Sequence, residues 1–320
     1  MPTEAILSTV RQFLGVDPTV RITLEPIKRG ASGRTIVRVK TPGHEPFIGV
    51  HWSEEREDNS QFIPVAQFLK QAKLRVPGII HARARYRVAL VEDLGDMDLL
   101  SLKDRPFAER LPLYRSAFEQ VDKLFYAKPP KDFHLMAPFD AALYRWEQEY
   151  FFEYMVEDFL GLDAGGLRKN EAFIDLSQRL GTVARHLVHR DFQSQNLMIK
   201  DDQVWLIDFQ GLRRGRQEYD LASLIFDPYL DHSADEREQL LRLWEEIADE
   251  RPLETLFHEC AAQRLMQALG AYGNIVKNRN DEWYRPHIVT AARLLGEVTA
   301  GTPLEAPLAP VLAKISPSDK

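Results

Sequence analysis

A short polar segment between two apolar runs carries the clearest chemical signal in the chain. It reads His189-Arg190-Asp191, then four residues, then Asn196, and an Asp-Phe pair follows at Asp208. Transfer of a phosphoryl group from ATP needs a carboxylate beside the acceptor hydroxyl and oxygen ligands for Mg²⁺. Asp191 fits the first role, and Asn196 and Asp208 fit the second. The pattern therefore predicts an enzyme that uses ATP and Mg²⁺.

The apolar residues around this segment indicate how its side chains are held. Residues 187–188, 197–199 and 204–207 predict three short buried strands, with Asp201 and Asp202 in the turn between the last two. A lone His-Arg-Asp tripeptide usually marks a solvated loop, and a lone aspartate often caps a helix. The joint spacing of the whole pattern, with its Asp-Phe pair directly after a strand, favours chemistry over both of those interpretations.

A glycine-containing turn lies between two strands predicted at residues 20–27 and 35–39. Gly30 and Gly33 would let backbone N–H groups approach nucleotide phosphates closely, and the hydroxyl of Ser32 is a further donor. Any hairpin can contain two glycines, so this interpretation depends on the downstream motif. We take these three residues as candidate nucleotide-binding residues.

The third predicted strand, residues 47–52, departs from the pattern expected of a kinase. Such a strand carries the lysine that holds the α- and β-phosphates, and here the corresponding residue is His51. Arg34, in the glycine turn, is the candidate substitute, because a guanidinium binds phosphate bidentately. The alternative, that Arg34 is a solvated turn residue, stays open.

Further candidates lie at the ends of other predicted elements. The segment 92–95 is interpreted as a hinge between an N-terminal lobe, residues 1–95, and a C-terminal lobe, residues 96–320. Its backbone would receive the adenine, so Glu92 and Leu94 are candidate nucleotide-binding residues. A predicted helix from residue 139 to 154 has an aromatic stripe that should be mostly core. Arg145 and Glu149 lie on its polar face and are candidate substrate-binding residues. The chain from residue 301 on carries four prolines and is expected to be irregular.

Length and composition exclude several classes of protein. The 320 residues suffice for one large or two small domains, and the net charge of -7 argues against a nucleic-acid-binding surface. The single cysteine, Cys260, excludes a disulfide framework and a cysteine-based metal site. The sequence has no apolar run near the roughly 20 residues that a membrane span needs. A soluble cytoplasmic enzyme with no membrane partner is expected.

The motifs resemble those of the protein-kinase-like superfamily, in the small-molecule branch typified by aminoglycoside and choline phosphotransferases. Residues 211–224 run straight from the Asp-Phe pair into a helix, and no Ala-Pro-Glu tripeptide marks a protein-substrate platform. Within this branch, most of residues 20–230 is similar to the bacterial anomeric kinases of N-acetylmuramate and N-acetylglucosamine. The similar stretches are residues 30–34, the third strand without a lysine at 47–52 and its continuation at 53–59, and residues 76–77, 88–95, 139–161, 189–196 and 208–210. The third strand without a lysine and the helix from residue 139 point to this subgroup.

This resemblance implies a bilobal α+β fold, with a small antiparallel-sheet N-lobe and a larger, mainly helical C-lobe. It also implies phosphorylation of the anomeric hydroxyl of an N-acetylated amino sugar in cell-wall recycling. A sugar-1-phosphate nucleotidyltransferase would be the downstream partner. Two alternatives stay open: a phosphotransferase for an aminoglycoside or another amino alcohol, and a non-catalytic nucleotide-binding module suggested by His51. The presence of Asp191, Asn196 and Asp208 argues against the second.

Overall fold

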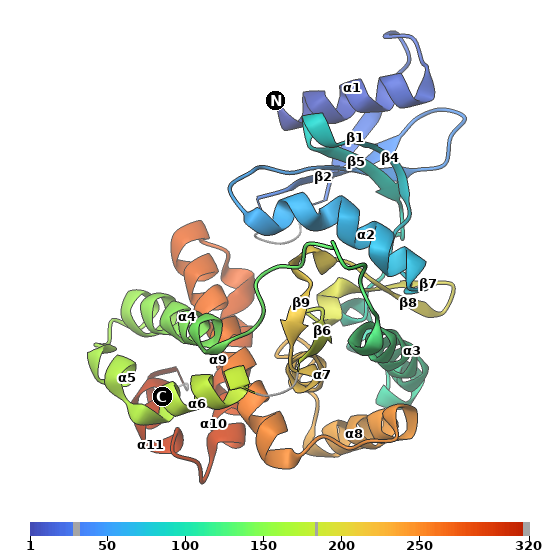
Figure 1. The fold of residues 1–320 in the computed structure, drawn as a ribbon. Helices are drawn as coiled ribbons and strands as arrows, with labels where there is room; N and C mark the ends of the chain where they lie inside the picture. The colour runs from blue at the N-terminus through green and yellow to red at the C-terminus, as the bar shows by residue number, and fades with distance from the viewer. Residues whose placement is uncertain (28–32, 183–184, 316–320) are drawn as a thin grey trace.

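The computed structural model describes residues 1–27, 33–182 and 185–315 (Figure 1). Gly30 and Ser32 lie outside the described residues. The N-terminal part contains one antiparallel sheet with the strand order β1-β2-β3-β5-β4. Its strands are β1 (Thr23–Pro26), β2 (Thr35–Lys40), β3 (Phe47–His51), β4 (Ile79–Arg83) and β5 (Val88–Glu92).

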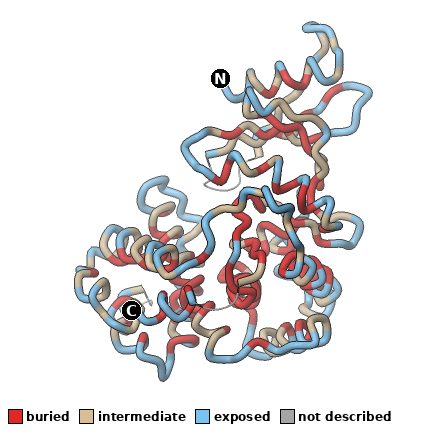
Figure 2. Tube along the Cα trace, viewed as in Figure 1, coloured by how far each residue is buried: buried red, intermediate tan, exposed pale blue. Residues whose placement is uncertain are grey.

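Two helices cover opposite faces of this sheet, α1 (Pro2–Leu14) above and α2 (Phe62–Gln71) below (Figure 1). Side chains alternate across a strand, so β5 sends Val88 and Leu90 towards α1 and Ala89 and Val91 towards α2. Both sets are buried (Figure 2). Gly49 of β3 allows the close approach of α1, because a Cβ there would lie 2.6 Å from the Ile6 side chain.

The rest of the chain is mainly helical (Figure 1). Together with the sheet, it confirms the predicted α+β fold. Its helices are α3 (Phe107–Tyr126), α4 (Ala141–Phe151), which continues as the π-helix η4 (Phe152–Phe159), α5 (Gly165–Lys169), α6 (Glu171–Thr182), α7 (Gln217–Ile225), α8 (Ala234–Ala248), α9 (Glu254–Arg279), α10 (Arg285–Thr299) and α11 (Glu305–Ile315). Among the residues that the structure describes, no helix is both long and apolar enough to cross a membrane.

Two small two-stranded sheets hold the motif segment. Strand β6 (His186–Val188) pairs with β9 (Arg213–Gly215), and β7 (Leu197–Lys200) pairs with β8 (Gln203–Leu206), both antiparallel. Asp201 and Asp202 form the turn between β7 and β8, as predicted. Both have positive φ, the conformation that a tight two-residue hairpin turn requires.

The prediction of an irregular segment after residue 301 is wrong, because α11 forms there. Pro307 lies in the first turn of α11, where the backbone N–H would have no partner within the helix. Pro310 lies inside the helix, but the buried side chains of Leu308 and Val311 join the main core, where α11 packs on α10. This burial outweighs the local cost of the proline.

Helix α9 continues for 26 residues through two glycines. Glycines at 270 and 273 let it cross α4 and η4 at close range. A Cβ at these two positions would lie 2.9 Å and 2.6 Å from the carbonyl oxygens of Tyr150 and Tyr154. The two glycines are contact points inside the helix and do not end it.

Candidate active site

A cavity of about 340 Å³ lies between the sheet and the helical part, and residues of both line it. The sheet contributes an apolar wall that includes Ile36, Ile48, Val50 and Val91. Six predicted site residues also line this cavity: Arg34, Glu92, Leu94, Asp191, Asn196 and Asp208. The structure thus brings together residues that are up to 174 positions apart in the chain.

A buried carboxylate of α7 binds the backbone of the loop that carries Asp191. Asp220 accepts hydrogen bonds from the backbone N–H groups of His189, at 2.6 Å, and Arg190, at 2.8 Å. Burial raises the pKa of Asp220 to about 7, although the two N–H donors oppose that shift. The ring of His189 is also buried, and its Nε2 donates to the carbonyl oxygen of Ile207 at 2.9 Å. Through these contacts, Asp220 and His189 brace the loop.

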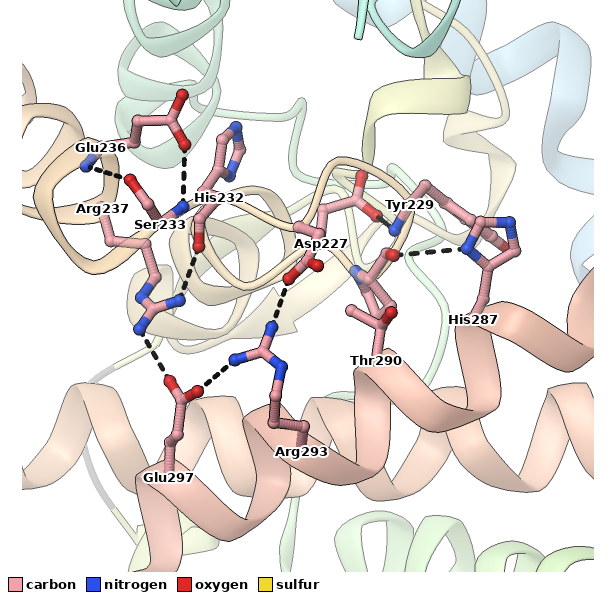
Figure 3. Close-up of polar contacts among 12 residues, drawn as sticks. Asp227, Tyr229, His232, Ser233, Glu236, Arg237, His287, Thr290, Arg293 and Glu297 are labelled. Atoms are coloured by element: carbon pink, nitrogen blue, oxygen red, sulfur yellow. Dashed lines mark hydrogen bonds and ion pairs between the residues drawn. The ribbon is translucent and has the colours of Figure 1, made fainter. Parts of the chain in front are cut away.

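A second buried carboxylate, which sequence reasoning missed, holds the other end of the loop. Asp227 accepts hydrogen bonds from the backbone N–H groups of Ser194, at 2.8 Å, and Tyr229, at 2.9 Å. Figure 3 shows Asp227 beside Tyr229 in the segment that follows α7. Because Tyr229 lines the cavity, Asp227 ties the loop to the cavity wall. The only signal in the sequence was an Asp-Pro pair after a helix, which usually marks a turn.

Asp208 follows β8 and adopts a left-handed conformation, with φ of 63°. Its carboxylate accepts a hydrogen bond from Nε2 of Gln210 at 2.9 Å and forms an ion pair with Arg34. Although burial favours the neutral acid, the guanidinium of Arg34 and the amide of Gln210 hold the pKa of Asp208 below its ordinary value. The carboxylate is therefore charged at neutral pH.

Asn196 faces the same cavity from the end of the loop. Its Nδ2 donates to the backbone carbonyl of Asp191 at 2.9 Å, so the amide oxygen points away from that carbonyl. In the described part of the chain, no cluster of three or more His, Cys, Asp or Glu side chains could hold a metal by itself. One amide and one carboxylate nevertheless fit Mg²⁺, which takes few protein oxygens and completes its coordination with substrate phosphates and water.

Glu92 and Leu94, the two residues expected at the hinge, differ in whether their polar groups are already bonded within the protein. The Glu92 carboxylate pairs with Lys200 at 2.6 Å and accepts the Gly78 N–H at 3.2 Å, while its own N–H donates to the Gly78 carbonyl. These groups of Glu92 are therefore engaged within the protein. Leu94 lines the cavity, and its side chain is largely buried. Gly33, with φ of 68°, is not among the lining residues.

Helix α9 forms a wall of the cavity that the sequence interpretation did not assign. It contributes Arg264, Gln267, Ala268, Ala271, Tyr272 and Ile275, and Tyr229 and Tyr284 adjoin them. The guanidinium of Arg264 lies 3.5 Å from the Asp191 carboxylate, 3.0 Å from Oε1 of Gln193 and 2.7 Å from Oγ of Ser223. The available signal for this contact was an arginine within the largely apolar stretch of residues 260–269.

Comparison with known proteins assigns the chain to a family. Residues 23–256 match the Phosphotransferase enzyme family. The chain belongs to this family. The resemblance inferred from the motifs is thereby confirmed, and the chain is a phosphotransferase.

Curated relatives of this phosphotransferase include three N-acetylmuramate/N-acetylglucosamine kinases. The protein from Pseudomonas aeruginosa is 25% identical over 312 residues, which cover 91% of this chain and 88% of the relative. The protein from Pseudomonas putida is 30% identical over 207 residues, 62% of this chain and 58% of the relative. The protein from Neisseria meningitidis is 25% identical over 269 residues, 78% and 80% of the two chains.

Solved structures share the fold of this phosphotransferase at low sequence identity. A thermostable mutant of aminoglycoside phosphotransferase APH(4)-Ia, in a ternary complex with ADP and hygromycin B, matches with a TM-score of 0.62 and 14% identity. The match covers 93% of this chain and all of the other. A choline/ethanolamine kinase family protein from Mesorhizobium loti matches with a TM-score of 0.59 and 14% identity, covering 97% and 99% of the two chains.

Arg145 and Glu149 do not line the cavity of the phosphotransferase. Both contact Arg168: Arg145 donates to its backbone carbonyl, and Glu149 accepts from its Nε at 2.6 Å. The expectation of an inward aromatic stripe on α4 also holds only in part, because Trp146 is 53% exposed. The polar residues Glu147 and Gln148 are buried in its place.

Proposed function

We propose that this phosphotransferase transfers the γ-phosphoryl group of ATP to the anomeric hydroxyl of an N-acetylated amino sugar. Residues 1–95 would bind the nucleotide, and residues 96–320 would carry the catalytic and acceptor groups. The observation that carries the proposal is the cavity that Asp191, Asn196 and Asp208 share with the segment after β5 and with α9. The ADP in the solved relative with hygromycin B supports ATP as the donor.

Each residue of the motif then has a separate role. Asp191 would accept the hydrogen bond of the acceptor hydroxyl, align its oxygen for attack and take its proton late in the transfer. Asn196 and Asp208 would hold Mg²⁺, which neutralises phosphate charge when bound. Leu94 would present its backbone to the adenine. An anomeric hydroxyl is more acidic than an ordinary alcohol, so alignment by Asp191 matters more than its basicity.

Arg264 would keep the Asp191 carboxylate in the orientation that this alignment needs. Its guanidinium is enclosed, and despite that burial the neighbouring Tyr219 and Asp191 raise its pKa, so it stays charged. Ser223 and Gln193 fix two of its nitrogen atoms. The charge beside Asp191 is therefore held in place by the protein before an acceptor arrives.

The chemistry of the α9 wall favours a sugar over a polycationic aminoglycoside. Its side chains are an arginine, a glutamine, tyrosines and small or apolar residues. The rings of Tyr229, Tyr272 and Tyr284 pack together, with centroids 5.6 Å apart for the first pair and 5.4 Å apart for the last two. Such rings suit the apolar face of a pyranose, whereas several ammonium groups would call for carboxylates. The names of the three curated relatives support the same acceptor class.

The proposal is tested by ATP consumption against a panel of free sugars, amino sugars and aminoglycosides. We expect N-acetylmuramate and N-acetylglucosamine to be turned over, and the product to be a sugar 1-phosphate that a nucleotidyltransferase could use. A 1-phosphate is non-reducing, so a reducing-end assay on the product separates the anomeric position from every other hydroxyl. A product that still reduces copper would overturn the anomeric assignment, and turnover of aminoglycosides alone would replace the acceptor class.

A further inference from the structure

The third strand of the sheet supplies no cation for the nucleotide phosphates. His51, which occupies the position expected for the lysine, ends β3 and is not among the residues that line the cavity. Burial and the nearby charge of Arg87 lower the pKa of His51 below its ordinary value, so its ring is neutral at pH 7. A phosphate-binding cation in the described residues must therefore come from another element.

Four arginines of the described residues line the cavity, and they differ in how far their side chains are exposed to it. Arg264 contacts Asp191, and Arg34 pairs with Asp208 and, at 2.8 Å, with Gln210, while its side chain is only 6% exposed. Arg190 is half-buried and its guanidinium lies against Gly211, while the carboxylates of Asp191 and Glu147 raise its pKa. The fourth is Arg56, whose side chain is 44% exposed.

Arg56 is held by a carboxylate that is itself buried. Its Nε and Nη2 donate to the two carboxylate oxygens of Asp58 at 3.2 Å and 2.9 Å, and Asp58 is 5% exposed. Both residues line the cavity. The fork to Asp58 uses one edge of the planar guanidinium and leaves the edge that carries Nη1 for another partner. A buried, bidentate carboxylate fixes the direction of that edge.

The segment that carries Arg56 and Asp58 packs against the residues next to Asp208. The turn η1 (Glu57–Gln61) contacts η6 (Phe209–Gly211), which directly follows Asp208. At the start of α2, the ring of Phe62 stacks on Phe209 with centroids 5.5 Å apart and an interplanar angle of 12°. The pair Arg56–Asp58 therefore lies at the end of the cavity where the proposed metal ligand would meet phosphate oxygens.

We propose that Arg56, oriented by Asp58, binds the nucleotide phosphates in place of the missing strand lysine. The inference rests on the proposed function only in taking ATP as the donor, and it does not depend on the acceptor. A guanidinium matches two phosphate oxygens at once, so one arginine can replace a lysine that acts as a point charge. Asp58 then orients Arg56 by an ion pair, as an acidic residue on the neighbouring helix orients the strand lysine in a kinase.

The test is the affinity of the full chain for Mg²⁺-ATP and for adenosine, measured by titration calorimetry on wild type, Arg56→Ala, Arg56→Lys and Asp58→Asn. Charged hydrogen bonds to phosphate predict an affinity for ATP that is about 10- to 100-fold weaker in Arg56→Ala. Affinity for adenosine should stay as in wild type, because adenosine has no phosphate. Arg56→Lys should retain part of the affinity, and Asp58→Asn should weaken it in the same direction.

Arg87→Ala is the matched control, because Arg87 is an arginine of the same sheet region, pairs with Glu54 at 2.9 Å and does not line the cavity. It should bind ATP as wild type does. Wild-type affinity in Arg56→Ala, together with loss of affinity in Arg34→Ala, would overturn the inference and assign the phosphates to Arg34. Wild type that binds ATP but phosphorylates no sugar would overturn the proposed acceptor and leave the result for Arg56 standing. Wild type that does not bind ATP would overturn both.

Discussion

His232 should make the stability of this protein fall steeply below pH 6.5. It lies between α7 and α8, next to the segment that carries Asp227 and Tyr229 (Figure 3), and is only 2% exposed. Its Nδ1 lies 3.1 Å from the Ile225 carbonyl oxygen, which can only accept, so Nδ1 carries the proton. Nε2 then accepts from the hydroxyl of Tyr114 at 2.6 Å. The folded protein holds the neutral ring.

The size of the stability loss follows from the shifted pKa of the His232 ring. Burial, with a contribution from the charge of Arg110, lowers the pKa of His232 from 6.5 to about 4. Between these two values the unfolded chain binds a proton that the folded protein does not, so stability decreases as pH falls. At about 1.4 kcal/mol per pKa unit, this single residue removes about 3 kcal/mol of the free energy of unfolding between pH 7 and pH 4. That is a large share of the roughly 5–15 kcal/mol typical of a folded domain.

The assay has two parts. The Cε1 proton resonance of His232, assigned by its absence in His232→Asn, should titrate with a midpoint near the low value in the folded protein. Urea unfolding of wild type and His232→Asn from pH 7 to pH 4 should show a smaller loss of stability with acid in the variant, by about 3 kcal/mol. The variant keeps a side-chain donor near the Ile225 carbonyl but has no titrating ring. Titration of His232 near 6.5, or equal acid dependence in the two proteins, would refute the reasoning.

Two further outcomes test the site. Asp208→Asn removes the charged oxygen proposed to hold Mg²⁺, so Mg²⁺-dependent turnover should be lost while the circular dichroism spectrum is unchanged. Normal turnover with normal Mg²⁺ dependence would show that Asp208 is not a metal ligand. Arg264→Gln should lower kcat by about 10-fold or more with little change in the KM for ATP, and Arg264→Lys should restore part of kcat, because only the orientation of Asp191 is affected. Equal losses in both variants, with a lower melting temperature, would mean that Arg264 serves packing alone.

The local features of the site could be predicted from the sequence. The spacing from His189 to Asn196 and the strand before Asp208 lie within a few residues of each other, so pattern and turn chemistry suffice to place them. The same holds for the turn at Asp201 and Asp202, where both residues have positive φ.

Other features depend on contacts between distant residues. Glu147 and Gln148 look like solvent-facing residues of α4, but the hydroxyl of Tyr219 donates to Glu147 and Gln263 bonds to both. Satisfied buried polar groups of this kind have no local period. The cavity wall formed by Arg264 could not be found for the same reason, because its partner Asp191 is more than 70 residues away. The helix α11 shows that burial can outweigh the local preference of proline.

The most direct test of the central claim is the turnover of Asp191→Asn compared with wild type, on N-acetylmuramate or N-acetylglucosamine with Mg²⁺-ATP. The variant keeps the shape of the side chain and loses the charge that aligns the hydroxyl and takes its proton. We predict a kcat at least about 100-fold lower, as for other positioned acid–base groups, with the affinities for ATP and sugar retained. Turnover by Asp191→Asn at the rate of wild type would contradict the account, because the cavity would then have lost its proposed catalytic residue without consequence.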